Sequence, residues 1–404
     1  MAVTGKWLTG RRAGDSPDGP KRKGSAMHSF YKFIGLVLVT LAVGPMLEGC
    51  APHHAGDDDD FTPGDDDNDD SSPGSGDDDS NDDDASPSDD DDDSDDDDND
   101  DDNDDDNDDF VWTPMPGTFS ELSGVWGTSH WDVFAAALDN IYHYDGDLWT
   151  PVTCGGEVCG GITVWGLSSS DVFAVGYGIL HYDGTSWSMQ NAPQIYLPGI
   201  WGASSSDVYA VGSAVAKPES YGYIYHYNGS EWSLVALTSL IMGNIWGTSA
   251  SDMFLTGISQ PAGSGPFRHY NGSVWQPMTG GNGYAFGNFW GTSHSDVFAS
   301  GEDIYGEHGA IAHYDGNAWT IIEAGTYPPL GGIWGSSASD IFTVGGTQSF
   351  LGTIAHYDGS SWSAMAGGPF PFLGNVWGSG PGDVFVVGTN SDYSGAIYHY
   401  GPPQ

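Results

Sequence analysis

The chain has 404 residues, of which 57 are acidic and nine are basic, and its formal charge at pH 7 is −48. Phosphate backbones and anionic lipid surfaces are bound through Lys and Arg, so both should repel a chain of this charge. Nucleic acid is therefore excluded as a partner, and neutral glycans, cationic proteins and metal ions remain as partner classes.

The N-terminal 50 residues have the pattern of an export signal. An apolar run over residues 33–46 follows Lys32 and the basic stretch 21–23, and it is shorter than a membrane-spanning helix. It ends in Leu47-Glu48-Gly49-Cys50, which resembles the lipobox of bacterial lipoproteins. The resemblance implies cleavage before Cys50 and lipidation of its thiol. The alternative is an ordinary signal peptide with an incidental cysteine.

On this interpretation, residues 27–50 are a lipoprotein signal peptide. Residues 1–26 are then either an unstructured leader or a stretch ahead of a true start at Met27. The protein would touch the membrane only through its lipid anchor. Ala51-Pro52 lacks the Asp often linked with inner-membrane retention, so we expect an outer-membrane location in the cell envelope, with surface exposure as one orientation.

The segment 51–109 has the composition of a disordered linker. Residues 57–109 include 32 Asp, with Asn, Ser, Gly and Pro and almost nothing apolar. Such a stretch cannot bury a core, and its like charges extend it. The main interpretation is a solvated stalk that separates a folded domain from the membrane. Weak, diffuse calcium binding is the second, because Ca²⁺ prefers carboxylate oxygens but no EF-hand spacing is present. No other cofactor is expected.

One motif occurs seven times between Ser123 and the C-terminus. It runs from Trp-Gly through Asp-Val-Phe, or a close variant, to His-Tyr. Successive Trp-Gly pairs lie 39, 36, 45, 44, 44 and 43 residues apart, and they begin at Trp126, Trp165, Trp201, Trp246, Trp290, Trp334 and Trp377. Internal periods of roughly 40–45 residues that are rich in Gly and Trp are typical of β-propellers.

Each repeat divides into four short strands. The first is predicted to end at Trp-Gly, and the second is the apolar Asp-Val-Phe segment, as expected of a strand buried on both faces. The third is Ile-x-His-Tyr. An Asp-Gly or Asn-Gly follows it in six repeats and predicts a type I′ hairpin turn. The fourth strand carries a second Trp. Four strands repeated seven times predict blades around one axis.

The last repeat ends at residues 400–404 without a fourth strand, and the missing strand is found at the other end of the domain. Phe110 to Met115 resembles the fourth-strand sequence Val274 to Met278. We therefore predict that a strand around Trp112 completes the seventh blade and closes the ring, which removes its open edges. The predicted fold is an all-β, seven-bladed propeller over residues 110–404.

The repeat also carries a resemblance to known proteins. Its pattern Trp-Gly-(Thr/Ser)-Ser-x-x-Asp-Val-Phe-x-Val-Gly, followed by Ile-x-His-Tyr-Asp-Gly-x-x-Trp, resembles the propeller repeats of exported lipoproteins from deltaproteobacteria. The Asp-Gly-x-x-Trp hairpin is more distantly similar to the Asp-box of sialidase-like propellers. The resemblance implies a seven-bladed propeller and an exported, lipid-anchored protein.

The three cysteines are one single residue in the N-terminal segment and one closely spaced pair in the repeat region. Lipidation would account for Cys50, and Cys154 and Cys159 lie in the connection between the first two blades. In an oxidising compartment we expect these two to form a small disulfide loop. A metal pair is the rival interpretation, but no His or Cys stands next to them in the sequence to complete a tetrahedron.

The histidines that recur in every blade are interpreted as structural. They are His143, His181, His226, His269, His313, His356 and His399. Each shares its repeat with an Asp that opens the second strand, and six repeats have a Ser in the preceding turn. With Trp, this set resembles the hydrogen-bonded tetrad of WD-repeat blades and would satisfy polar groups at strand ends. We predict no catalytic residue and no metal site.

The turns and loops at the two ends of the blades differ in how much their sequence and length vary among the repeats. First-second turns and third-fourth hairpins share one end and are nearly identical among repeats. Second-third loops and blade connections share the other end, here called the loop face, and vary in length and composition. Binding residues generally lie on loops held by a rigid scaffold. The loop-face aromatics predicted to bind ligand are Tyr196, Tyr221, Tyr284, Phe286, Tyr305, Tyr327, Phe370, Phe372 and Tyr393.

These observations favour a non-catalytic binding module, monomeric and anchored in the envelope, that recognises a glycan or protein through its loop face. Aromatic rings suit both ligand classes, although the same rings could simply pack the loops. One alternative is a glycan-cleaving enzyme that uses loop carboxylates. Candidate acids are Glu157, Glu219, Glu302, Asp303, Glu307, Glu323 and Asp392. Another alternative is a scaffold for envelope assembly.

Overall fold

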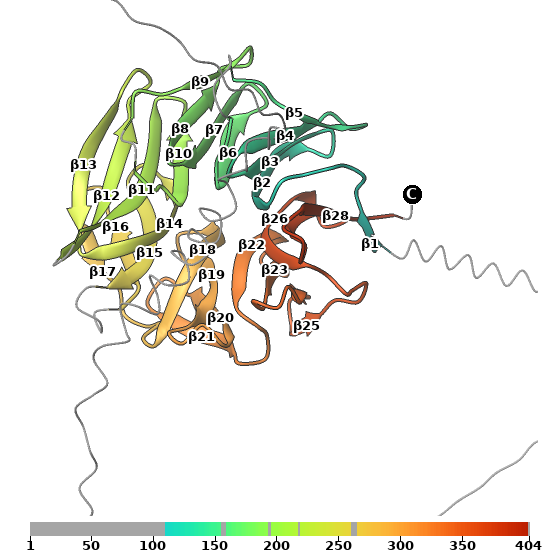
Figure 1. Ribbon diagram of the computed structural model, residues 1–404. Coiled ribbons are helices and arrows are strands. Elements are labelled where there is room, and N and C mark those ends of the chain that lie inside the picture. The colour runs from blue at the N-terminus through green and yellow to red at the C-terminus, as the bar shows by residue number, and fades with distance from the viewer. Residues whose placement is uncertain (1–109, 155–158, 193–194, 217–218, 260–264, 403–404) are drawn as a thin grey trace, which may run out of the picture. The chain divides into compact units, whose positions relative to one another are not determined.

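The computed structural model describes residues 110–154, 159–192, 195–216, 219–259 and 265–402. Across these residues, 28 strands form seven four-stranded antiparallel sheets, and there is no helix. Figure 1 shows the sheets arranged as blades around a common axis. The predicted seven-bladed propeller is confirmed. Within the described ranges, no helix is long and apolar enough to cross a membrane.

Each blade is a meander whose first strand lies nearest the axis, because the first strands of adjacent blades contact one another around the ring. The first strands are β2 (Leu122–Ser129), β6 (Thr163–Ser168), β10 (Gly199–Ser204), β14 (Leu240–Ser249), β18 (Tyr284–Ser293), β22 (Leu330–Ser337) and β26 (Phe372–Gly380). The second strands are β3 (Asp132–Ala137), β7 (Asp171–Gly176), β11 (Asp207–Ala216), β15 (Asp252–Ser259), β19 (Asp296–Asp303), β23 (Asp340–Gly346) and β27 (Asp383–Thr389).

The two outer strands complete each blade. The third strands are β4 (Asn140–Tyr144), β8 (Gly178–Tyr182), β12 (Glu219–Tyr227), β16 (Phe267–Tyr270), β20 (Gly309–Tyr314), β24 (Gly352–Tyr357) and β28 (Gly395–Gly401). The fourth strands are β5 (Trp149–Pro151), β9 (Trp187–Met189), β13 (Trp232–Thr238), β17 (Trp275–Pro277), β21 (Trp319–Ala324), β25 (Trp362–Ala364) and, for the last blade, β1 (Val111–Pro114).

The ring is closed by the N-terminal strand, as the sequence predicted. β1 pairs antiparallel with β28, and Trp112 lies opposite Tyr400. Trp112 is buried, and its ring packs edge-on against Phe342 and Phe370. The two ends of the domain therefore form one blade, and the third strand of that blade is not left with an open edge.

The first strands extend further than predicted. Each continues two residues past the glycine of Trp-Gly, as β10 does from Gly202 to Ser204. The extension contains a bulge, since Gly202 pairs with Val208 but Ser204 pairs with Asp207. A bulge adds one residue to one strand and increases its local twist. The last two residues of each first strand therefore lie in the segment that was predicted to be a Ser-rich turn.

The hairpin between third and fourth strands is present, but its turn type differs from the type I′ prediction. Gly146 has a φ of 94°, whereas no Asp or Asn of these hairpins has a positive φ. Instead, the carboxylate of Asp145 accepts hydrogen bonds from the backbone N–H groups of Asp147 and Leu148, at 3.0 and 2.9 Å. The side chain thus stabilises the turn directly.

The hydrophobic core is divided into seven clusters, one at each junction between blades. Second strands contribute most, because they have a blade on either side. Residues 172–176 of β7, for example, are all buried. A single blade could not bury both faces of such a strand, so the core forms only when neighbours stack.

Candidate functional site

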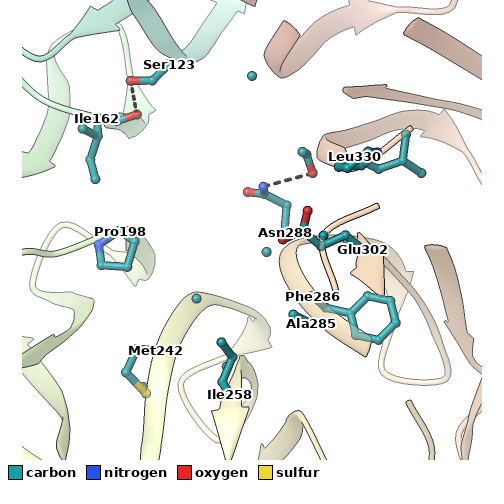
Figure 2. Close-up of a pocket in the computed structure, with 18 of the residues that line it drawn as sticks. Ser123, Ile162, Pro198, Met242, Ile258, Ala285, Phe286, Asn288, Glu302 and Leu330 are labelled. Carbon is teal, nitrogen blue, oxygen red and sulfur yellow. Dashed lines mark hydrogen bonds between the residues drawn. The ribbon is translucent and has the colours of Figure 1, made fainter. Parts of the chain in front are cut away.

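A cavity of about 920 Å³ lies at the loop face, where the first strands begin around the axis. Its lining comes from the start of the first strands, the end of the second strands and the loops between second and third strands. Figure 2 shows Ile162, Pro198, Met242, Ile258 and Leu330 around it. The variable loops of the sequence therefore surround this cavity.

Polar side chains at the start of the first strands connect neighbouring blades. Ser123 Oγ donates a hydrogen bond to the carbonyl of Ile162 at 2.9 Å. Asn244 Nδ2 donates to Asn288 Oδ1 at 2.8 Å, and Asn288 Nδ2 donates to the carbonyl of Gly331 at 3.1 Å. These bonds hold the cavity wall rigid, because each joins two blades.

Glu302, the next-to-last residue of β19, is the half-buried acid of the cavity. Burial, with a smaller contribution from the charge of Asp303, raises the pKa of Glu302 to about 7. Among the described residues, no hydrogen bond to its carboxylate is present. Figure 2 shows Glu302 on the same wall as Asn288. A carboxylate in such a place is stabilised by any cation that enters the cavity.

The adjacent acid, Asp303, has the opposite environment. Successive residues of a strand point to opposite faces, and Asp303 is not among the residues that line the cavity. Its small burial raises its pKa, but hydrogen bonds from Glu307 N–H and the His308 ring outweigh this effect and lower the pKa overall. Glu307, at the tip of this loop, is exposed and does line the cavity.

The charge of the cavity is uniformly acidic. Glu302 and Glu307 are its charged lining residues, and the described lining includes no Lys or Arg. The propeller segment as a whole has 22 acidic and two basic side chains, which leaves a formal charge of −20 with His neutral. Anionic ligands are therefore disfavoured both at long range and within the cavity.

The nine predicted ligand-binding aromatics fall into three groups. Tyr196, Phe286 and Phe372 line the cavity. Burial raises the pKa of the Tyr196 hydroxyl to about 12. Phe286 is itself almost fully buried, and its ring stacks on Phe267 with centroids 4.9 Å apart.

A second group packs inside the protein. Tyr327 and Phe370 are buried in the clusters between blades and hold the connections down. This is the packing role that the sequence left open for such rings.

The third group lies on the surface of the loop face, outside the cavity lining. Tyr221, Tyr305 and Tyr393 are exposed, and Tyr284 is half-buried beside Phe286.

Sequence reasoning missed most of the cavity wall, including Ile241, Met242 and Asn288. A signal was present two residues before each Trp-Gly, where the residue type varies among Gly, Thr and Asn while Trp-Gly itself is constant. The residues there are Gly124, Thr163, Gly199, Asn244, Asn288, Gly332 and Asn375. Glu302 stood among the candidate acids, but only the fold brings it to the cavity.

At the opposite end of the blades, each recurring histidine is paired with the Asp that opens the second strand. Seven hydrogen bonds from His Nε2 to Asp Oδ1 have lengths between 2.6 and 2.8 Å, as between His181 and Asp171. In five blades a Thr or Ser hydroxyl four residues earlier donates to the second carboxylate oxygen. No Trp indole of the described residues joins this network.

The two blades without that hydroxyl differ from each other. Leu167 replaces it before Asp171, and the Oδ2 atom of Asp171 is buried without a hydrogen bond. Ala203 replaces it before Asp207, where the hydroxyl of Tyr209 bonds the carboxylate instead. Tyr209 occupies the position that Phe takes in the other six blades.

Cys154 and Cys159 are joined as a disulfide, with Cα atoms 5.5 Å apart. Both are buried against the junction of the first two blades. Cys50 and Glu157 lie outside the described residues, as do the linker 51–109 and the leader.

The sequence matches no protein-family model and no curated protein. Solved structures with the same fold include "YCF48 bound to D1 peptide", which is 15% identical with a TM-score of 0.55, over 72% of this chain and 97% of that one. The WD40 β-propeller domain of Doa1 is 13% identical with a TM-score of 0.55, over 72% and 96% of the two chains.

A third similar structure is the GH74 xyloglucanase from Xanthomonas campestris, at 11% identity and a TM-score of 0.51, over 70% of this chain and 54% of that chain. Identities this low establish the propeller fold alone. Function has to be argued from the site itself.

Proposed function

We propose that this protein is a non-catalytic binding module that takes a protein segment or a glycan into the cavity of the loop face. The observation that supports the proposal most directly is the position of the cavity. It lies where the non-repeating residues of seven blades meet, on a wall braced by hydrogen bonds between blades. Concave, mostly apolar sites with a few polar groups are the usual form of ligand pockets.

The chemistry of the cavity favours a protein segment with a cationic group over a neutral glycan. Apolar walls suit a peptide, and Glu302 would pair with an amine or guanidinium that enters beside it. The charge of −20 on the propeller would also speed the approach of a basic partner. The structural neighbour solved with a bound peptide shares the fold and fits this class of ligand.

We also propose that the domain is held at the outer membrane by a lipid on Cys50, with residues 51–109 as the spacer and as a weak, diffuse calcium binder. The support is the lipobox-like sequence and the Asp-rich composition. Labelling with a radioactive fatty acid tests the anchor, and replacing Cys50 with Ser should abolish the label. Light scattering of the delipidated protein tests for a monomer.

Binding is tested with a peptide library and a glycan array on the full-length protein. We expect selected peptides to carry Lys or Arg and to lose affinity for the Glu302→Gln variant. Glu323→Gln is the matched control, because Glu323 lies on β21 outside the cavity lining. Selection of a glycan, with the same sensitivity to Glu302, would support the glycan form. Ligands that bind both variants equally would contradict the proposed site.

The alternative is glycan cleavage with Glu302 as the acid. A carboxylic acid with a pKa near neutrality is suited to protonating a leaving group, and Glu307 is the second acid of the cavity. Turnover of an oligosaccharide that Glu302→Gln abolishes, with binding retained, would establish this function. A scaffold role in envelope assembly would instead be indicated by co-purification with an outer-membrane complex independently of Glu302.

A further inference from the structure

Two histidines break the sevenfold pattern at the end of the blades opposite the cavity. His130 and His294 occupy the same repeat position, two residues before the Asp that opens the second strand. The equivalent residues elsewhere are Ser169, Ser205, Ala250, Ala338 and Pro381. Because five blades fold without a histidine there, the position is not required by the blade. A function specific to these two places is the alternative.

Each of these histidines reaches into the network of the preceding blade. His294 Nδ1 lies 2.7 Å from Asp252 Oδ1, and that same oxygen is 2.6 Å from His269 Nε2. The geometry repeats at the junction of the last and first blades. There His130 Nδ1 and His399 Nε2 both lie 2.6 Å from Asp383 Oδ1. In each group, the two nitrogens and the carboxylate oxygen lie within 4.8 Å of one another.

The surroundings fix the orientation of all three side chains. The hydroxyl of Thr248 donates to Asp252 Oδ2, and Ser379 does the same for Asp383. The ring of Phe254 lies against both imidazoles of its group, with centroids 4.8 Å from His269 and 5.8 Å from His294. Supporting hydrogen bonds and packing of this kind are what orient metal ligands in proteins.

The geometry points to two metal sites, and we propose that each group binds a divalent transition ion of the Zn²⁺ class. Two imidazole nitrogens and one carboxylate oxygen are a ligand set typical of zinc, with a fourth position left for water. The side chain of His294 is 49% exposed, so solvent can supply that water. Hard ions such as Ca²⁺ are disfavoured, because they prefer oxygen ligands.

Metal entry requires a small local adjustment. Ligand atoms about 2.0–2.2 Å from a tetrahedral ion are separated by roughly 3.3 Å, so each nitrogen must move about 0.6 Å from the shared oxygen. Each imidazole must also carry its proton on the other ring nitrogen. In each group the histidine from the following blade is the more exposed of the two, with side-chain exposures of 49% for His294 against 20% for His269, and 25% for His130 against 5% for His399, so the movement falls on His294 and His130.

The ion would join two blades that already contact each other at this end through side-chain hydrogen bonds and through the packing of a Trp on a Gly. One site lies between the fourth and fifth blades, and the other lies at the seam where the ring closes. An ion that binds only the assembled ring stabilises it by linkage. Zinc should therefore make opening of the propeller at these two junctions less favourable.

The test is zinc titration of the full-length protein, with His130→Ser, His294→Ser and the double variant. Serine occurs at this position in two other blades, so each variant should keep its fold. We expect each single variant to lose one tightly bound zinc ion and the double variant to lose two. Zinc should raise the Tm of the wild type and leave that of the double variant unchanged. Residues 57–109 are the same in every variant, so any ions that they bind do not change the difference in zinc stoichiometry between variants.

His308→Ser is the control, since His308 pairs with Asp303 at 3.0 Å without a second histidine. It should retain the wild-type zinc stoichiometry. Equal stoichiometry in the wild type and the double variant would overturn the proposal. A double variant that melts lower without metal but binds zinc normally would also overturn it, and would identify the two histidines as hydrogen-bonding braces.

Discussion

Trp377 of the last blade packs its indole against Gly127 of the first blade. A Cβ atom on Gly127 would lie 2.8 Å from Trp377 Cη2, closer than carbon atoms approach. The same contact occurs at all seven junctions, where the tryptophan of each Trp-Gly pair covers the glycine of the next. Each Trp-Gly pair therefore contacts both neighbouring blades. Its Trp ring packs on the next blade, and its Gly leaves room for the Trp ring of the previous blade.

Replacing Gly127 with Ala should destabilise the propeller by about 1–3 kcal/mol, since the added methyl would lie 2.5 Å from the carbonyl oxygen of Asp132 and 2.8 Å from the indole of Trp377, and both must shift. Urea unfolding of the purified variant measures this change. The matched control is Gly380→Ala, because a Cβ atom there has no neighbour within 4 Å. Equal losses in the two variants would show that close approach is not the cause.

The closing strand should carry much of the stability of the ring. Deleting residues 110–116 removes the pairing of β1 with β28 and exposes the third strand of the last blade. We expect a marked fall in Tm by differential scanning calorimetry. Trp112→Ala should cost about 3–5 kcal/mol by cavity formation alone. The nearby Val111→Thr is the control, because Val111 is exposed. A deletion variant that melts like the wild type would refute closure by this strand.

Glu302 should make stability fall as pH rises. Its folded pKa of about 7 lies above the ordinary Glu value, so the folded state holds the proton more tightly than the unfolded state. Stability is therefore full below about pH 4, declines between pH 4 and 7, and stays reduced above. Glu302→Gln should remove this loss and stabilise the protein by up to about 3 kcal/mol at pH 8. Urea unfolding at pH 4 and pH 8 measures the difference, and a gain that is equal at both values would contradict the assignment.

Asp383 should have the opposite effect. Burial raises its pKa, but hydrogen bonds from His399 and Ser379, and then from His130, outweigh burial and lower the pKa to about 2. The resulting stabilisation is present above about pH 4 and is lost as the pH falls towards 2. It amounts to about 2 kcal/mol. Asp383→Asn should therefore be less stable than the wild type at pH 6, and the gap should narrow in melts near pH 2. A difference in stability between the two proteins that does not change with pH would exclude the lowered pKa of Asp383 as its cause.

Much of the architecture could be predicted because the repeat is periodic. Trp-Gly, Asp-Val-Phe and His-Tyr recur at nearly constant spacing, so four strands per unit, seven blades and closure by the Trp112 strand followed from local patterns. The exceptions were local as well. The bulge after Gly202 and the turn at Asp145 depend on hydrogen bonds that strand patterns do not encode.

The sequence by itself determined the repeat, the ring and the loop face, because each repeat specifies its own strands and its own inter-blade contacts. Only the tertiary structure decided which residues meet. Glu302 shares a cavity with residues of the other six blades, such as Ser123 and Asn375, because the loop-face ends of all seven blades meet around the axis. His294 reaches Asp252, 42 residues earlier, because one blade's turn lies over the end of the previous blade. Such contacts depend on how blades stack, and no pattern within a single repeat contains that information.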